Sequence, residues 1–217
     1  MKIISFSLWG NIPMYTVGAL ANIELAKEIY PDWVCRFYVD GTVNNEFKEK
    51  IKSNGGEIVE ITSNKGAFWG MFWRFMANDD PNMEAMISRD CDSRLNFREK
   101  AAVDEWLNSD MSFHTMHDHP HHRPEPVLGG MWGAKKGCID NITGKIEKWG
   151  QYHRKSIDQD FLHFVIWNTV KPKTISHSSI PNIWNAARPF PNHRDIYCGG
   201  TFVGQIFDEN NRAMIPR

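Results

Sequence analysis

The sequence predicts one α/β domain in which helices flank a mostly parallel sheet. The chain has 217 residues, of which 41% are hydrophobic and 24% charged, so it is long and apolar enough to bury a core. Its first half alternates short apolar runs with segments of helical spacing, and turn residues separate them. This alternation favours right-handed βαβ units, whose ligands bind outside the carboxyl ends of the strands.

The elements of the first half follow from their patterns in chain order. Residues 2–9 form a largely apolar run of strand length that ends at turn residues. Leu20, Ile23 and Ala26 then repeat at helical spacing, and Pro31 lies just beyond the end of that segment. The same reasoning predicts strands at 2–9, 33–40, 57–62 and 84–90 and helices at 16–30, 43–56, 68–79 and 96–110.

The regular pattern ends near residue 110. Asn96 and Glu99, at the start of the last predicted helix, have the spacing of a capping pair. Residues 111–217 are rich in proline, histidine and glycine, with one clear helix predicted at 158–170, and the chain ends in loops around 181–195 and a short segment at 202–207. We therefore expect the two halves to build one domain over 1–217, the second half completing a site that the first half positions.

Composition argues against several classes of partner. Lys plus Arg total 25 against 26 Asp plus Glu, so no basic surface for nucleic acid or an anionic membrane is expected. The N-terminus lacks a signal-peptide core, and no window reaches the roughly 20 apolar residues of a membrane span, so we expect a cytoplasmic protein. Reduced thiols are expected because no CxxC pair occurs among Cys35, Cys91, Cys138 and Cys198.

An acidic pair follows the strand predicted at 84–90. Residues i and i+2 of an extended chain face the same side, so Asp90 and Asp92 bring two carboxylates together while Cys91 points to the core. Carboxylate oxygens suit Mg²⁺ or Mn²⁺, and such an ion neutralises a departing diphosphate. Acidic pairs also cap helices and form turns. Their position at the carboxyl end of a strand favours the metal site.

A cluster of histidines between residues 114 and 122 has a different spacing from a zinc site. Pro120 and Pro124 stiffen this segment, and neither a cysteine nor a regular helical histidine pair accompanies it. We therefore do not predict a zinc site there.

A set of motifs spans nearly the whole chain: SFSLWG, CRFYVDG, FWRF, SRDCDSRLNFREKAAVDEW, DHPHH, LGGMWGAKKG, DQDFL, PFPNHRD and FVGQIFDE. As an ensemble, they resemble the GT-A glycosyltransferases, most closely the small chlorella-virus type and its bacterial relatives.

The resemblance implies a single-domain, Rossmann-like GT-A fold with a nucleotide-binding half (1–110) and an acceptor-side half (111–217). It further implies a UDP-sugar donor, with glucose as the default, a glycan or glycoprotein acceptor, and Mn²⁺ (or Mg²⁺) on Asp90 and Asp92. It also places DHPHH on a loop at the active site. Retention of configuration is favoured, and a viral member would act in the host cytoplasm.

The resemblance also assigns donor-binding roles in the first half. Ser7, Leu8 and Trp9 resemble the segment that cradles uridine, and Asp40 resembles the acid that contacts the base or ribose. The alternative is that Trp9 packs in the core and Asp40 caps a turn. Arg74 resembles an arginine that reaches the phosphates or the sugar, for which a planar guanidinium is suited, although a solvated helix arginine is the alternative.

Three further assignments fall in the second half. Asp160, and after it Asp158, resemble the acid beside the donor sugar and acceptor, although both also suit the first turn of a helix. His177 resembles a late histidine that completes the metal shell, and a surface histidine is the alternative. Arg194, with His193, is a candidate for contacting the diphosphate.

A glycine-rich turn completes the predicted site. Gly130 and its neighbours allow the backbone to approach a ligand, and Trp132 either stacks on a sugar or is buried beneath the turn. Two other functions fit the same residues: a non-catalytic module that binds sugar nucleotides or glycans, and a metal-dependent nucleotide hydrolase.

Overall fold

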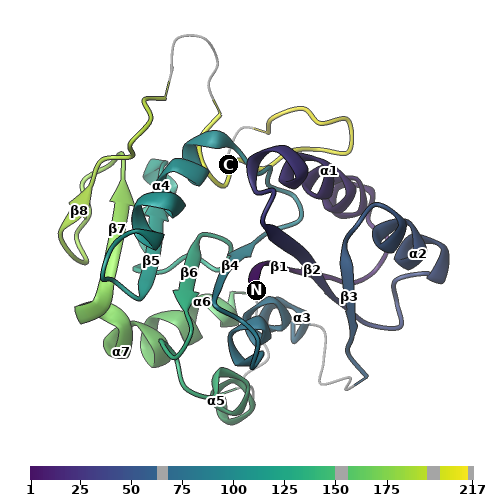
Figure 1. The fold of residues 1–217 in the computed structure, drawn as a ribbon, viewed down its shortest axis with the longest axis horizontal. Coiled ribbons are helices and arrows are strands. Elements are labelled where there is room, and N and C mark those ends of the chain that lie inside the picture. The colour runs from purple at the N-terminus through teal and green to yellow at the C-terminus, as the bar shows by residue number, and fades with distance from the viewer. Residues whose placement is uncertain (63–67, 150–155, 195–200, 215–217) are drawn as a thin grey trace.

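The computed structural model describes residues 1–62, 68–149, 156–194 and 201–214, and within these ranges eight strands form one sheet (Figure 1). The order is β3-β2-β1-β4-β6-β5-β7-β8, and neighbours are parallel except that β6 runs antiparallel to β4 and β5. The mostly parallel α/β sheet predicted from the sequence is confirmed. The strands are β1 (Lys2–Leu8), β2 (Trp33–Val39), β3 (Glu57–Glu60), β4 (Ala85–Arg89), β5 (Phe113–His117), β6 (Trp132–Lys135), β7 (Thr174–Ser178) and β8 (Ala187–Arg188).

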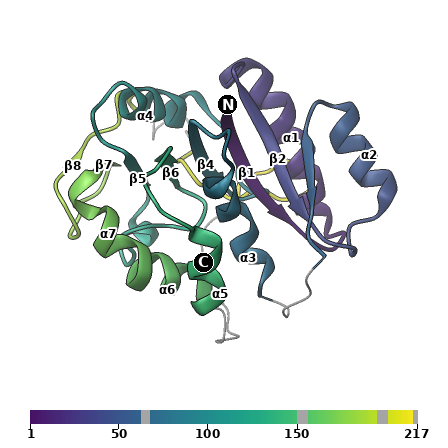
Figure 2. The same ribbon diagram turned by 60° about the horizontal axis from the view of Figure 1, so that its bottom comes forward.

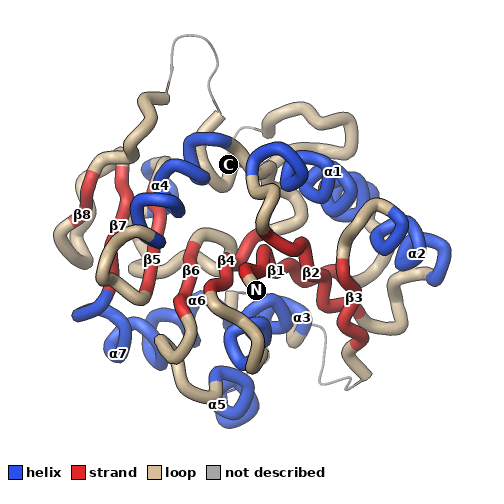
Figure 3. Tube along the Cα trace, viewed as in Figure 1, coloured by secondary structure: helices blue, strands red, loops and turns tan. Residues whose placement is uncertain are grey.

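Helices connect the strands, as Figure 3 shows in blue. The α-helices are α1 (Pro13–Ile29), α2 (Asn45–Ser53), α3 (Gly70–Trp73), α4 (Phe97–Leu107), α5 (Ile142–Trp149), α6 (Ile157–Phe161) and α7 (Asn168–Val170). Short 3-10 helices span Arg74–Asp79, Pro120–His122 and Lys171–Lys173, and a π-helix spans Leu162–Trp167 between α6 and α7.

Two hydrophobic layers hold the helices on opposite faces of the sheet (Figure 2). One layer joins β1, β2 and β4 to α1, α2 and α4 through residues such as Ile4, Ile23 and Trp106. The other joins the sheet to α3, α5 and α6 through residues such as Phe72 and Phe161. Because successive side chains of a strand face opposite sides, β1, β2 and β4 contribute to both layers.

Local signals explain where several helices begin. Pro13 occupies the first turn of α1, where a missing N–H leaves no bond unmade. Asn44 accepts from the Phe47 N–H and caps α2, and Asn96 accepts from the Glu99 N–H at 2.9 Å and caps α4. The predicted capping pair is thus half formed. The Glu99 carboxylate instead contacts the buried Arg89 at 3.2 Å.

Two predicted helices differ from the structure. Residues 68–79 form a short α-helix followed by a 3-10 helix, and the change falls at Arg74, whose N–H donates to Ser7 Oγ. Residues 158–170 are helical throughout but contain a π-helix. The structure also contains β5, β6, β7 and α5 in the second half, which were not predicted from the sequence.

The described cysteines are free thiols, as expected from the sequence. Cys35, Cys91 and Cys138 are buried free thiols, while Cys198 lies outside the described residues. Among the helices of the described ranges, none has the length and hydropathy that crossing a bilayer requires.

Candidate functional site

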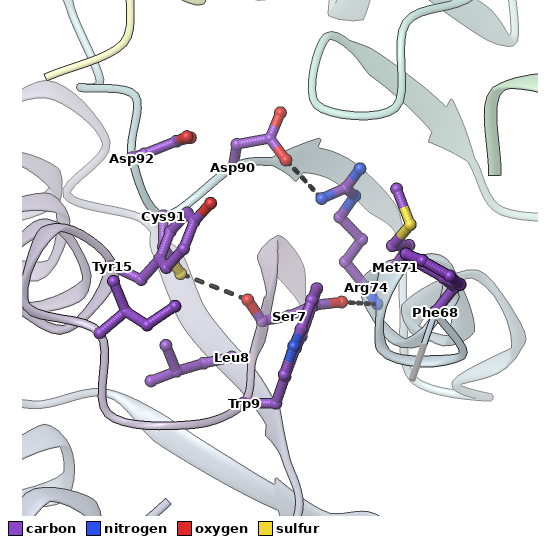
Figure 4. Close-up of a pocket in the computed structure, with 11 residues that line it drawn as sticks. Ser7, Leu8, Trp9, Tyr15, Phe68, Met71, Arg74, Asp90, Cys91 and Asp92 are labelled. Atoms are coloured by element: carbon purple, nitrogen blue, oxygen red, sulfur yellow. Dashed lines mark hydrogen bonds and ion pairs between the residues drawn. The ribbon is translucent and has the colours of Figure 1, made fainter. Parts of the chain in front are cut away.

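A pocket of about 340 Å³ lies where β1 and β4 end, as Figure 4 shows. These strands are parallel neighbours, so the residues after Leu8 and Arg89 emerge side by side. A concave site with apolar walls and a few convergent polar groups is the usual form of a small-molecule site. Its lining residues are Ser7, Leu8, Trp9, Ile12, Tyr15, Phe68, Met71, Arg74, Asp90, Cys91 and Asp92.

Arg74 joins three of the residues predicted from the sequence. Its side chain is buried, and its backbone N–H donates to Ser7 Oγ at 2.8 Å. Its guanidinium pairs with Asp90 through Nη1 and with Asp158 Oδ2 through Nη2 at 3.0 Å. Figure 4 shows Arg74 reaching across the pocket wall to Asp90. An arginine in this setting needs such partners, because an unpaired buried charge is strongly destabilising.

Carboxylates outnumber the guanidinium in this cluster. Burial, and then the neighbouring Asp90, raise the pKa of Asp92 to about 7, against the opposing effect of Arg74. Burial also raises the pKa of Asp158. For Arg74, burial acts to lower the pKa, but Asp90 and Asp158 outweigh it and the pKa is raised. The cluster therefore favours additional positive charge.

Two glycines allow the cluster to be this compact. A Cβ added to Gly129 would lie 2.7 Å from Asp158 Oδ2 and would also overlap the Arg74 guanidinium. A Cβ on Gly130 would overlap Asp90 Oδ2. The backbone at these glycines thus lies against the acidic cluster, as the predicted close approach requires. Any larger side chain there would displace the residues of the cluster.

Neighbouring elements hold the loop that carries the acidic pair. The side chain of Asn22, buried in α1, donates to Ser93 O at 2.9 Å and accepts from Leu95 N at 3.0 Å. From the other end of the chain, Phe207 N donates to Asp92 O at 2.8 Å. The segment 202–207 therefore braces this loop, which its sequence alone did not indicate.

The donor set fits a hard divalent cation. Asp90 and Asp92 supply carboxylate oxygens, and the Asp90 side chain is 43% exposed, so an ion can reach it from the pocket. Asp158 Oδ1 and Arg74 Nε are buried without a hydrogen-bond partner among the described residues. Buried polar atoms are normally satisfied, so these two atoms indicate a site built for a ligand.

Solved structures share this architecture, although no family model and no curated protein matches the sequence. The galactosyltransferase LgtC, in complex with donor and acceptor sugar analogues, superposes with a TM-score of 0.53 at 16% identity, covering 82% of this chain and 74% of its own. The mannosyltransferase PcManGT from Pyrobaculum calidifontis, in complex with GDP-Man and Mn²⁺, gives a TM-score of 0.51 at 12% identity. The protein has the GT-A fold. The match to PcManGT covers 88% of this chain but only 57% of the length of that mannosyltransferase.

The segment predicted to cradle a base lies in the pocket of this GT-A fold. Ser7 and Leu8 end β1, and Trp9 follows, 38% exposed, with its ring at 80° to that of Trp73. Asp40 follows the neighbouring β2, where it accepts from Thr42 N at 3.0 Å in a turn. Asp40 is not among the described residues that line the pocket, so the turn role is the one observed for it.

His177 is not brought to the acidic pair. It is fully buried in β7, where Nδ1 lies 2.9 Å from His114 Nε2 and Nε2 lies 3.3 Å from Glu105 Oε2. Within the described residues, no group of three or more potential ligands close enough to hold a metal is found. The geometry thus gives no support to a shared ligand set of Asp90, Asp92 and His177.

The remaining predicted residues lie outside the pocket lining. Arg194 donates to Asp118 O at 2.9 Å and belongs to a separate cluster beyond β5. Asp160 is partly exposed in α6, in the same turn as Asp158. Trp132 is fully buried in β6 and stacks on Phe113 at 5.3 Å, so of its two predicted roles the buried one is observed.

Sequence reasoning missed four lining residues. Ile12 and Tyr15 flank the proline that begins α1, directly after the first strand, and that position was the available signal. Burial, and then the Asp92 and Asp90 charges, raise the pKa of the Tyr15 phenol. Phe68 and Met71 lie in an aromatic run with no polar partner to single them out.

Proposed function

We propose that the protein is a metal-dependent GT-A glycosyltransferase, related to the chlorella-virus type, that moves a sugar from a UDP-sugar to a glycan hydroxyl. The observation that carries the proposal is the cluster of Arg74 with Asp90 and Asp158, beside Asp92, at the mouth of the pocket. A site with paired carboxylates and one guanidinium suits a diphosphate bound with a cation.

The pocket divides by chemistry into a base end and a phosphate end. Leu8, Trp9 and Phe68 offer the flat apolar walls that a uracil ring needs. Arg74 lines the pocket, and its planar guanidinium is suited to donate to phosphate oxygens. Asp90 and Asp92 would hold Mn²⁺ or Mg²⁺, which supplies positive charge against the departing diphosphate.

The sugar end lies toward α6. In transfer, the acceptor oxygen forms a bond to the anomeric carbon, the bond from that carbon to the diphosphate breaks, and UDP leaves with the electron pair. The hydroxyl proton passes to a base. Asp160 is the proposed acceptor of this proton because it is partly exposed, whereas the buried Asp158 orients Arg74. We propose that the acceptor attacks from the face that UDP leaves, which retains the configuration, and that the donor sugar is a hexose such as glucose.

Calorimetry of UDP binding tests the central assignment. The variant Asp90→Ala/Asp92→Ala should lose the gain in UDP affinity that Mn²⁺ gives the wild type. The exposed acids Asp32 and Asp110 provide a matched control, since Asp32→Ala/Asp110→Ala removes the same charge away from the pocket. Unchanged metal-dependent affinity in the first variant would remove the proposal.

Product analysis separates the proposal from its two alternatives. A transferase with Mn²⁺ should release UDP from a UDP-sugar and form a glycoside. A nucleotide hydrolase should yield phosphate or a nucleoside monophosphate instead. A binding module should bind donor without turnover, seen as a shift in melting temperature that follows donor concentration.

A further inference from the structure

Four aromatic rings form a continuous row outside the pocket, which we call the aromatic row: Trp184, His163, Phe164 and Trp149. The His163 and Phe164 rings are stacked, with centroids 4.6 Å apart and planes 8° apart. Trp184 meets His163 edge-on at 4.9 Å, and Trp149 lies 6.5 Å from Phe164 at 33°. The row draws on three separate segments, so the fold and not one local motif assembles it.

Phe164 is the exposed ring of the aromatic row, whereas Trp149 and Trp184 are partly buried and pack against the core. Phe164 is 59% exposed, and the His163 side chain is 26% exposed. Polar groups border the rings: Glu125 Oε2 lies 3.2 Å from His163 Nδ1, and Trp184 Nε1 donates to Arg123 O at 3.1 Å. Exposed aromatic surface edged by a carboxylate and an imidazole suits an amphipathic ligand rather than a purely apolar one.

The row lies on the same edge of the sheet as the acidic cluster. Since β6 is antiparallel to both β4 and β5, β5 and β7 run in the direction of β4. Glu125 follows β5 and Trp184 follows β7, so both leave the sheet at the edge where Asp90 leaves β4. Whichever molecule binds the row therefore approaches from the side of the site.

One helix links the row to the site directly. Asp158 and Gln159 of α6 contact Arg74 and the Gly129 N–H, at 3.0 Å and 2.6 Å. The π-helix that continues α6 carries His163 and Phe164. A π-helix is less stable than an α-helix and occurs often at functional sites, which is an independent indication that this turn serves a ligand.

We propose that the aromatic row is the acceptor subsite, and that it binds a pyranose ring of a neutral glycan. A pyranose presents a face of C–H groups, which packs on aromatic rings, and a rim of hydroxyls, which Glu125 and His163 would bind. This inference rests on the proposed function, because it names the acceptor of the same reaction. The proposed subsite differs from a protein-docking surface because a sugar needs the polar groups of Glu125 and His163 as well as the aromatic rings.

Saturation-transfer NMR with defined sugars tests the subsite without turnover. The probes are the methyl glycosides of glucose, galactose and rhamnose, each at tens of millimolar, with the indole N–H signal of Trp184 followed in parallel. Phe164→Ala should weaken binding about tenfold, as expected for the loss of one ring contact. Phe164→Tyr keeps the ring and should restore binding. Phe97→Ala is the matched control, because Phe97 is 57% exposed at the start of α4.

The outcomes separate this proposal from the proposed function. Sugar binding that falls in Phe164→Ala, returns in Phe164→Tyr and is unchanged in Phe97→Ala supports the subsite, whether or not UDP binds. Wild-type protein that binds UDP with Mn²⁺ but none of the three glycosides would overturn the subsite and leave the donor site standing. Equal binding by wild type and a folded Phe164→Ala variant, or concentration-dependent self-association lost in that variant, would also overturn it.

Discussion

Two Arg–Asp clusters at the carboxyl edge of the sheet use the same residue types differently. Arg98 donates two hydrogen bonds to Asp118, from Nε to Oδ2 at 2.9 Å and from Nη2 to Oδ1 at 2.8 Å. Val203 N also donates to Asp118 Oδ2, at 3.0 Å, and Asp118 is fully buried. Arg74 instead divides its guanidinium between two carboxylates, one of them exposed to a pocket.

The difference teaches how an ion pair that holds the fold differs from one that serves a site. Both Asp118 oxygens are satisfied, and although burial acts to raise its pKa, Arg98 and other donors hold the pKa below the usual value. Asp158, in contrast, keeps an oxygen without a partner among the described residues, and its pKa is raised by burial. The partnerless oxygen beside the pocket, not the presence of an ion pair, therefore distinguishes the Arg74 cluster, which we propose binds the ligand.

The largest expected effect is a loss of stability when the ion pair of Arg98 and Asp118 is broken. Asp118→Ala leaves Arg98 without its buried partner and releases Val203, so the free energy of unfolding should fall by about 3–5 kcal/mol. Urea unfolding measures this. Asp104→Ala, which removes a half-exposed partner of Lys100, should cost about 0.5 kcal/mol or less. Equal losses in the two variants would remove the structural role of Asp118.

A smaller effect, on ligand affinity, is expected from a substitution that disturbs the cluster of Arg74, Asp90 and Asp158. Gly130→Ala places a Cβ against Asp90 Oδ2, so the carboxylate must move, and Mn²⁺-dependent UDP affinity should fall roughly tenfold to a hundredfold. Calorimetry reads the affinity, and the melting temperature should change little. Gly41→Ala is the control, since an added Cβ there meets nothing within 4 Å. A full-affinity Gly130→Ala variant would contradict the described packing.

Acid should lower the stability of the protein through His122, which lies beside the Arg98–Asp118 pair. Asp118 N donates to His122 Nδ1 at 3.0 Å, and burial, with nearby His117, lowers the pKa of His122 to about 3. The unfolded chain takes up this proton below a pH of about 6.5, so stability is complete above that pH and is lost at about 1.4 kcal/mol per pH unit below it. In urea unfolding between pH 6 and 5, His122→Leu should reduce the slope by that amount. An unchanged slope would show that His122 is protonated in the fold.

The smallest effect concerns the thiol between the two acids. Burial, followed by Asp92 and Asp90, raises the pKa of Cys91 well above the usual value, and burial raises the pKa of Cys35 to about 12. Neither thiol should react appreciably with iodoacetamide at pH 8, because the thiolate is the nucleophile. Peptide mass spectrometry checks each cysteine separately. Rapid labelling of Cys91 would mean that the pocket floor is more open than described.

The first half was predictable because its strands are buried runs bounded by turn residues. β1 and β4 carry isoleucine, phenylalanine and methionine, and the polar residues just beyond them form the site. The parallel arrangement then places Asp90 beside Ser7 without further information. Arg74 was identified by resemblance, but its partnership with Asp158 depends on a contact across 84 residues that no local pattern encodes.

The second half was harder because its strands are short and polar. FHTMH and TISHS bury histidine, threonine and serine through cross-strand contacts, such as Thr115 Oγ1 to Ser176 Oγ at 2.7 Å. Such residues read as loops until their partners are known. The contacts of His177 could not be predicted for the same reason, because its partners His114 and Glu105 are distant in sequence.

Asn22 has a consequence for anyone who redesigns this protein. One amide side chain in α1 fixes both a carbonyl and an N–H of the loop that follows Asp92, so this loop is held by a residue that is not among the described residues lining the pocket. Libraries that diversify the pocket walls should therefore leave position 22 fixed. An aspartate there would keep the acceptor but lose the donor, and half of the clamp would be gone.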